Sequence, residues 1–154
     1  MAASTRVDGL DRVAGPRPAA RPVLLATLGV PFEPAAAQLA VDSAVEAGSR
    51  LVIANVVELA PLPLSVVLGY DHIQEPDVAD ALLAPAELAR ALGVEVERLL
   101  VRSPRPVTAL LELVAEVGPG LLVFGPDQAR LRRRRYAKAA KAIRERCTCL
   151  FWLA

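Results

Sequence analysis

Short apolar runs alternate with longer segments of helical periodicity along the chain. The run over residues 51–57 is almost continuously apolar, as in a strand that is covered on both faces of a sheet. By contrast, the run over residues 94–101 begins with alternating apolar and charged positions, which is typical of a more exposed edge strand. The pattern therefore predicts five β-strands, over residues 23–27, 51–57, 94–101, 121–125 and 149–153.

The segments between these runs carry apolar residues at the spacing of amphipathic helices. Pro34 suits the first turn of one helix, whereas Pro85 is expected to kink another helix or divide it in two. The predicted helices cover residues 34–48, 78–93, 107–118 and 136–147. Strands that alternate with helices indicate a parallel sheet joined by right-handed crossovers. We therefore predict a doubly wound α/β domain, with a five-stranded parallel sheet and helices on both faces.

Composition and length suit one globular domain. The chain has 154 residues, and its apolar fraction of 54% consists mainly of Ala, Val and Leu. No apolar run is long enough for a transmembrane helix, since Pro61 and Pro63 interrupt the richest one. Residues 1–20 lack the apolar core of a signal peptide. We expect a flexible tail over residues 1–20, a folded domain over residues 21–154, a cytoplasmic location and no membrane partner.

A ligand of such a sheet would lie beyond the carboxyl ends of the strands, where the strand order reverses. If the chain winds outward both ways from its middle, the loops after the first and fourth strands line this crevice. These loops are residues 28–31 and 125–129. Glycine-rich turns that open onto a helix N-terminus can hold phosphate through main-chain N–H groups. The two loops are therefore the predicted ligand site.

Several short segments carry a resemblance to a known family. They are Ala-Thr-Leu-Gly at 26–29, Gly-Val-Glu-Val-Glu at 93–97, Leu-Leu-Val-Phe-Gly at 121–125, the basic helix and the last strand after Cys147. In their order and spacing, residues 21–154 resemble the universal stress protein family. The resemblance implies a Rossmann-like fold with strand order 3-2-1-4-5. It also implies a homodimer in which the last strands of two copies pair, through Leu150, Phe151, Trp152 and Leu153.

The nucleotide-binding motif of that family is incomplete in this chain. Nucleotide-binding members carry Asp at the position of Leu28, and a G-x2-G-x9-G-S/T motif after the fourth strand. Gly125 matches the first glycine of the motif, but Gln128 stands at the second. Pro126 also removes a main-chain donor where donors are needed. We therefore predict that the family's ATP pocket is not preserved.

The end of the motif can be placed in two registers. Counting forward from Gly125 puts its last two positions on Lys-Ala at 138–139. Counting back from Cys147 puts them on Arg-Tyr at 135–136, with a shorter loop. Either register lacks the glycine and the hydroxyl.

The loops and the resemblance together give a set of candidate ligand-binding residues. Val56 occupies the position of a main-chain adenine contact in the family. Asp127 carries a carboxylate that could bind Mg²⁺ beside a phosphate, and Thr27 offers a hydroxyl. For Thr27 and Asp127 we favour turn or capping roles, because the sequence identifies no partner for either. The full set is Thr27, Leu28, Gly29, Val56, Gly125, Asp127, Arg130 and Arg132.

Nine of the eighteen basic residues lie between Arg130 and Arg146, although the net charge is only +1. Guanidinium groups could hold phosphate in place of the missing loop amides, or an acidic protein partner. Four consecutive arginines point around the whole helix, so they cannot all reach one ligand, and we favour a solvated helix face. Nucleic acid is not expected, because Tyr136 is the one aromatic residue there. We call the following residues the basic cluster: Arg130, Arg132, Arg133, Arg134, Arg135, Lys138 and Lys141.

Cys147 and Cys149 form a C-x-C pair at the predicted start of the last strand. On a strand their thiols would share a face, and we favour packed, reduced and unreactive thiols over redox or metal chemistry. Metal binding would need more ligands, and the single histidine, His72, lies far away in sequence. No motif places a nucleophile beside His72, so neither a metal site nor a catalytic site is predicted.

Two functional hypotheses remain open. The one we favour is a non-catalytic regulatory protein of the universal stress protein type, which acts through dimerisation and partner binding and uses no cofactor. The alternative is a binder of a nucleotide or another phosphorylated small molecule through the cluster between Arg130 and Lys141.

Overall fold

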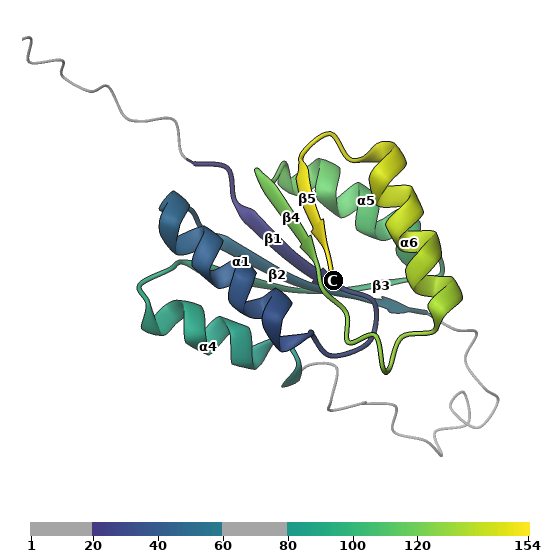
Figure 1. Cartoon of the computed structure of the whole chain (residues 1–154), viewed down its shortest axis with the longest axis horizontal. Coiled ribbons are helices and arrows are strands. Elements are labelled where there is room, and N and C mark those ends of the chain that lie inside the picture. Colours follow the sequence, from purple (N-terminus) through teal and green to yellow (C-terminus); the bar gives the residue numbers. More distant parts are fainter. Residues whose placement is uncertain (1–19, 60–79) are drawn as a thin grey trace, which may run out of the picture.

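The computed structural model describes residues 20–59 and 80–154 of the chain, and all structural statements below concern these residues. Strands and helices alternate along them (Figure 1). In chain order they are β1 (Val23–Thr27), α1 (Pro34–Ala47), β2 (Leu51–Glu58), α4 (Leu83–Ala91), β3 (Val96–Ser103), α5 (Pro106–Val117), β4 (Leu121–Phe124), α6 (Arg133–Arg146) and β5 (Leu150–Leu153).

The five strands form one parallel sheet in the order β3-β2-β1-β4-β5. Strand β1 lies at its centre, where Val23 is in register with Leu51 of β2 on one side and with Leu121 of β4 on the other. The order reverses between β1 and β4, so the loops after these two strands meet at the carboxyl edge of the sheet. The predicted fold class and strand order are confirmed.

Helices cover both faces of the sheet because its central strands are apolar on both sides. In β1, Leu24 and Ala26 pack in the core under α5 and α6, whereas Val23 and Leu25 pack in the core under α1 and α4. Figure 1 shows the two helix pairs on opposite sides of the sheet. All five residues of β1 are buried, which explains why its sequence shows no alternation of apolar and polar positions.

Several element boundaries differ from the sequence prediction; helix α6, for example, begins at Arg133 and not at residue 136. Pro85 lies in the first turn of α4, which begins at Leu83; the first N–H groups of a helix have no internal partner, so proline is tolerated there. Strand β3 begins at Val96, two residues later than expected. Strand β5 begins at Leu150, so the expectation that Cys147 and Cys149 share a strand face is wrong, since both precede the strand.

The two edges of the sheet differ in character. From Arg98 to Ser103 of β3, exposed positions alternate with partly buried ones, as expected for an exposed edge. On β5, Phe151 and Leu153 pack against the core, whereas Leu150 is 72% exposed and Trp152 is 36% exposed. None of the helices within residues 20–59 and 80–154 is long and apolar enough to span a membrane. The predicted tail and His72 lie outside the described residues.

Candidate functional site

The turn after β1 is fixed by hydrogen bonds from its own residues. The Thr27 hydroxyl donates to the main-chain oxygen of Val30 at 2.9 Å. Gly29, with a φ of 67°, donates its N–H to the side-chain oxygen of Asn55 at 2.8 Å. A positive φ favours glycine, so Gly29 lets the chain turn here while Asn55, a residue that the sequence analysis did not single out, holds it. Both polar side chains are fully buried beneath the turn.

Gly125 is needed for close packing of α1 on the sheet. A Cβ atom built on Gly125 would lie 2.2 Å from the Cβ of Ala36, which is far inside normal contact distance. Its main-chain N–H and oxygen are both bonded, to the oxygen of Ala26 and the N–H of Glu33. The residue that matches the first glycine of the family motif is therefore explained by packing against Ala36.

The loop after β4 is bonded to the loop after β1. The Asp127 N–H donates to the oxygen of Pro31 at 2.8 Å, and Phe32 forms a β-bridge with Pro126. The Asp127 carboxylate accepts the N–H of Ala129 at 3.0 Å, which is the geometry of a side-chain-capped turn. Thr27 and Asp127 thus both make turn contacts, and ligand binding by either stays a prediction.

Apolar side chains fill the space beneath these loops. Leu28 is 1% exposed and Leu131 is 7% exposed, and both belong to the core that contains Val56 and Phe124. The Tyr136 ring stacks on Phe124, with ring centroids 5.8 Å apart. A nucleotide-binding member of the family would place a carboxylate at the Leu28 position, whereas here that position is part of the hydrophobic core.

The same region is tied to the end of β5. The Tyr136 hydroxyl and the Gln128 side-chain amide both donate to the main-chain oxygen of Ala154. Tyr136 is therefore half-buried between the core and Ala154, and is not free to stack on a base.

The structure brings together six of the eight candidate ligand-binding residues and separates the other two. The six at the carboxyl ends of β1, β2 and β4 are Thr27, Leu28, Gly29, Val56, Gly125 and Asp127. Arg130 and Arg132 are exposed just before α6 and lie apart from these six residues. Of the four consecutive arginines, Arg134 and Arg135 line the hollow described next, whereas Arg132 and Arg133 do not.

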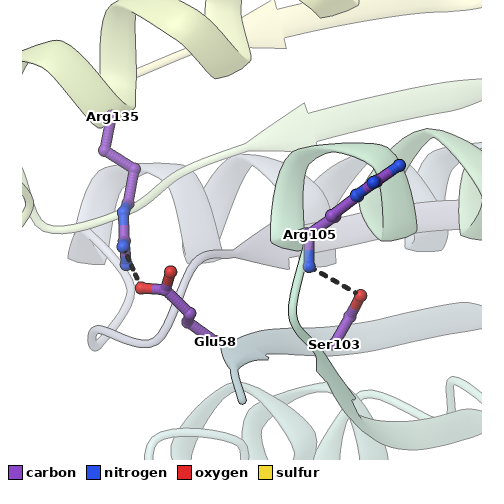
Figure 2. Close-up of polar contacts among 4 residues, drawn as sticks. All are labelled: Glu58, Ser103, Arg105 and Arg135. Atoms are coloured by element: carbon purple, nitrogen blue, oxygen red, sulfur yellow. Dashed lines mark hydrogen bonds and ion pairs between the residues drawn. The ribbon is translucent and has the colours of Figure 1, made fainter. Parts of the chain in front are cut away.

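Part of the basic cluster instead faces a hollow over the carboxyl ends of β2 and β3. Figure 2 shows Arg135 reaching from α6 to the carboxylate of Glu58, with which it forms an ion pair. In the same view the Arg105 N–H donates to the Ser103 hydroxyl at 3.1 Å, at the turn into α5. We call this hollow the basic hollow; it is lined by Glu58, Pro104, Arg105, Pro106, Val107, Thr108, Arg134, Arg135 and Lys138.

Sequence analysis did not associate Glu58, Arg105 or Thr108 with the basic cluster. Glu58 precedes Arg135 by 77 residues, so no local pattern connects the two. The pair forms because β2 ends beside the first turns of α6, and this arrangement is known only from the fold.

The two cysteine thiols lie next to each other in the loop before β5. Partial burial, together with the neighbouring Cys149 thiol and its hydrogen bond, raises the pKa of Cys147 from 9.0 to about 11. The Cys147 thiol is therefore protonated at neutral pH, and a protonated thiol is a poor nucleophile and metal ligand. Within the described ranges no three Cys, His, Asp or Glu side chains are grouped so as to hold a metal ion.

Comparison with known proteins agrees with the resemblance seen in the sequence. The sequence profile described as the universal stress protein family matches residues 19–153. A search of curated proteins finds no match to the chain.

Solved structures of universal stress proteins share the fold. One from Burkholderia pseudomallei is 19% identical, with a TM-score of 0.63, and the match covers 87% of this chain and 95% of that one. A universal stress protein in complex with cAMP is 22% identical, with a TM-score of 0.58 and coverage of 89% and 98%. One from Archaeoglobus fulgidus in complex with dAMP is 17% identical, with a TM-score of 0.57 and coverage of 86% and 95%.

Proposed function

Because the chain belongs to the universal stress protein family, we propose that it is a non-enzymatic regulatory protein that acts through dimerisation and partner binding. We further propose that it does not bind ATP in the crevice between β1 and β4. The observation that carries this proposal is the state of the crevice loops. They are hydrogen-bonded to each other, and Leu28 and Leu131 are buried beneath them.

The proposed dimer surface is the free edge of β5. Leu150 and Trp152 are exposed there, and Phe151 and Leu153 anchor the strand to the core. A strand at the edge of a sheet carries unpaired N–H and C=O groups that can pair with another strand. A second copy related by two-fold symmetry would satisfy these groups and cover the same apolar side chains on both subunits.

The dimer is tested by the mass of the full chain in solution, measured by light scattering at micromolar concentration. We expect twice the chain mass, and we expect Leu150→Asp to shift the mass towards the monomer. Leu100→Asp is the matched control, because Leu100 is 41% exposed on β3, at the opposite edge of the sheet. A monomeric wild-type chain would contradict the dimer proposal.

The crevice proposal is tested by thermal shift and by incubation with ATP. We expect no stabilisation specific to ATP over plain phosphate at moderate salt, and no release of ADP above the rate in buffer. Stabilisation by ATP alone, retained as salt rises, would contradict it, because salt weakens contacts that rest only on exposed charges.

A second candidate function is the binding of a nucleotide or another phosphorylated small molecule through the basic cluster. Two observations favour it. Solved universal stress proteins are described in complex with cAMP and with dAMP, and three cations of α6 line one hollow in this chain. Thermal shift with AMP, cAMP and inorganic phosphate, at low and moderate salt, tests it. The cytoplasmic location and the domain limits 21–154 stay predictions.

A further inference from the structure

The basic hollow is distinct from the two crevice loops, although Arg135 and Lys138 are positions on which the end of the family motif falls in one register or the other. Its lining comes from the end of β2, from the turn into α5 and from the first two turns of α6. It includes no residue of the loops 28–31 and 125–131. A ligand could therefore bind in the hollow while the crevice keeps its hydrogen bonds and its buried leucines.

Charge in the hollow is strongly unbalanced. Among the residues that the structure describes, four basic residues line it, namely Arg105, Arg134, Arg135 and Lys138, against one carboxylate, that of Glu58. Arg134 and Lys138 are four residues apart on α6, so they share a helix face and repel each other. A bound anion would offset this repulsion, whereas water alone only screens it.

One of these cations is already paired with an anionic side chain of the protein, Glu58. Its carboxylate pairs with Arg135, and both side chains remain partly exposed, at 43% and 37%. An exposed ion pair of this kind contributes little to stability, so an incoming anion can replace the carboxylate at low cost. The guanidinium end of Arg105 points away from Glu58 (Figure 2), and Arg105 is exposed.

The chemistry of the lining indicates which anion fits. Arginine presents paired N–H donors that match phosphate oxygens, and the Thr108 hydroxyl adds a neutral donor. Among residues 20–59 and 80–154, no aromatic side chain lines the hollow, so these residues offer nothing on which a base could stack. Its volume of about 380 Å³ lies at the lower end of small-molecule pockets, which favours a small ligand over a polymer.

We infer that the basic hollow is a phosphate site that recognises a small phosphomonoester through its phosphate group, with Glu58 as the internal anion that the phosphate displaces from Arg135. This inference rests on the second candidate function and assigns it a site. It requires that inorganic phosphate and AMP bind with similar affinity, because the base makes no stacking contact.

The test is calorimetric titration of the full chain with inorganic phosphate and with AMP, at low salt. We expect Arg134→Gln/Lys138→Gln to weaken phosphate binding by about tenfold or more, since two charge-assisted contacts are lost. We expect Glu58→Gln to strengthen it by roughly three- to tenfold, since a competing carboxylate is removed while the shape is kept. Arg90→Gln/Arg144→Gln removes the same charge from exposed helix positions away from the hollow and serves as the control.

One further variant separates this site from the basic cluster as a whole. Arg132→Gln/Arg133→Gln changes two exposed arginines of the same helix region that do not line the hollow. If this variant weakens phosphate binding as much as Arg134→Gln/Lys138→Gln does, the hollow is not the phosphate site. The second candidate function, binding through the basic cluster, would still stand. No phosphate binding by the wild-type chain would overturn both. Weaker binding by Glu58→Gln would overturn the displacement of Glu58, because the carboxylate would then be supporting the ligand.

Discussion

Two regions at the carboxyl edge of the same sheet have opposite character. The crevice between β1 and β4 is closed by main-chain hydrogen bonds and contains buried leucines. The basic hollow, beyond the ends of β2 and β3, is open and lined by four cations. In this chain the place that the family motif marks for a nucleotide is part of the core, while the positive charge lies to one side of it.

The difference shows that a motif residue can be kept for a reason unrelated to its ligand. Gly125 matches the motif, yet its lack of a side chain is required by Ala36 of α1. A residue type alone therefore does not say whether a phosphate or a neighbouring helix needs the space. Substitutions in the crevice should accordingly change stability, and substitutions in the hollow should change anion binding.

The largest effect is expected for Leu28→Asp, which restores the acidic residue of nucleotide-binding members. Leu28 is 1% exposed in an apolar core, and an unpaired buried carboxylate there should lower the free energy of unfolding by about 4 kcal/mol at pH 7. Burial raises the pKa of the new carboxyl in the folded state, so the folded state holds its proton to higher pH than the unfolded chain does. The loss should therefore be smaller at pH 4 than at pH 7.

Urea unfolding at these two pH values measures the effect of Leu28→Asp. Leu28→Asn is the control, because it buries a polar group of similar size that does not titrate. If both variants show the same pH dependence relative to wild type, the Leu28 position is not an apolar site that excludes charge.

A somewhat smaller decrease in the free energy of unfolding is expected for Gly125→Ala. The added methyl group would overlap the Ala36 side chain, and overpacking of this kind costs about 2–3 kcal/mol. The same change in an Ala36→Gly background should cost much less, because the overlapping Cβ atom is gone. Thermal unfolding of the four proteins of this double-mutant cycle measures the coupling. Additive losses would mean that Gly125 is required for something other than contact with Ala36.

Tyr136→Phe should lower the free energy of unfolding by about 1 kcal/mol or less. The variant removes the hydroxyl that donates to the Ala154 oxygen, but Gln128 still donates to that oxygen, and the stacking on Phe124 remains. Combining it with Gln128→Ala should cost more than the sum of the single changes, because the oxygen then loses both donors. Denaturant unfolding is the measurement, and strict additivity would argue against the shared acceptor.

The smallest effect on stability is expected for Arg135→Gln in the basic hollow. Its ion pair with Glu58 is more than one-third exposed on both sides, so the free energy of unfolding should change by about 0.5 kcal/mol or less. The same unfolding experiment applies. A loss as large as that of Gly125→Ala would make the pair part of the structural core and remove the contrast between the two regions.

The pattern of apolar positions was sufficient to predict the fold class, because buried parallel strands and amphipathic helices differ in the local spacing of their apolar residues. The strand order was predicted from the family resemblance. Turn roles for Thr27 and Asp127 were also within reach, since each side chain bonds to the main chain two or three residues away. Leu28 and Pro126 led to the prediction that the family's ATP pocket is not preserved, but the burial of Leu131 was not predicted.

Only the tertiary structure decided the contacts between residues that are distant in sequence. Gly125 meets Ala36, Asn55 holds Gly29, and Arg135 meets Glu58 because the parallel sheet brings the carboxyl ends of its strands to one edge. Which arginines of α6 face the hollow depends on the rotation of that helix against the sheet. That rotation is set by the packing of Ala139 and Ile143 in the core. Four consecutive arginines are identical in sequence, so the run itself does not show which of them face the hollow.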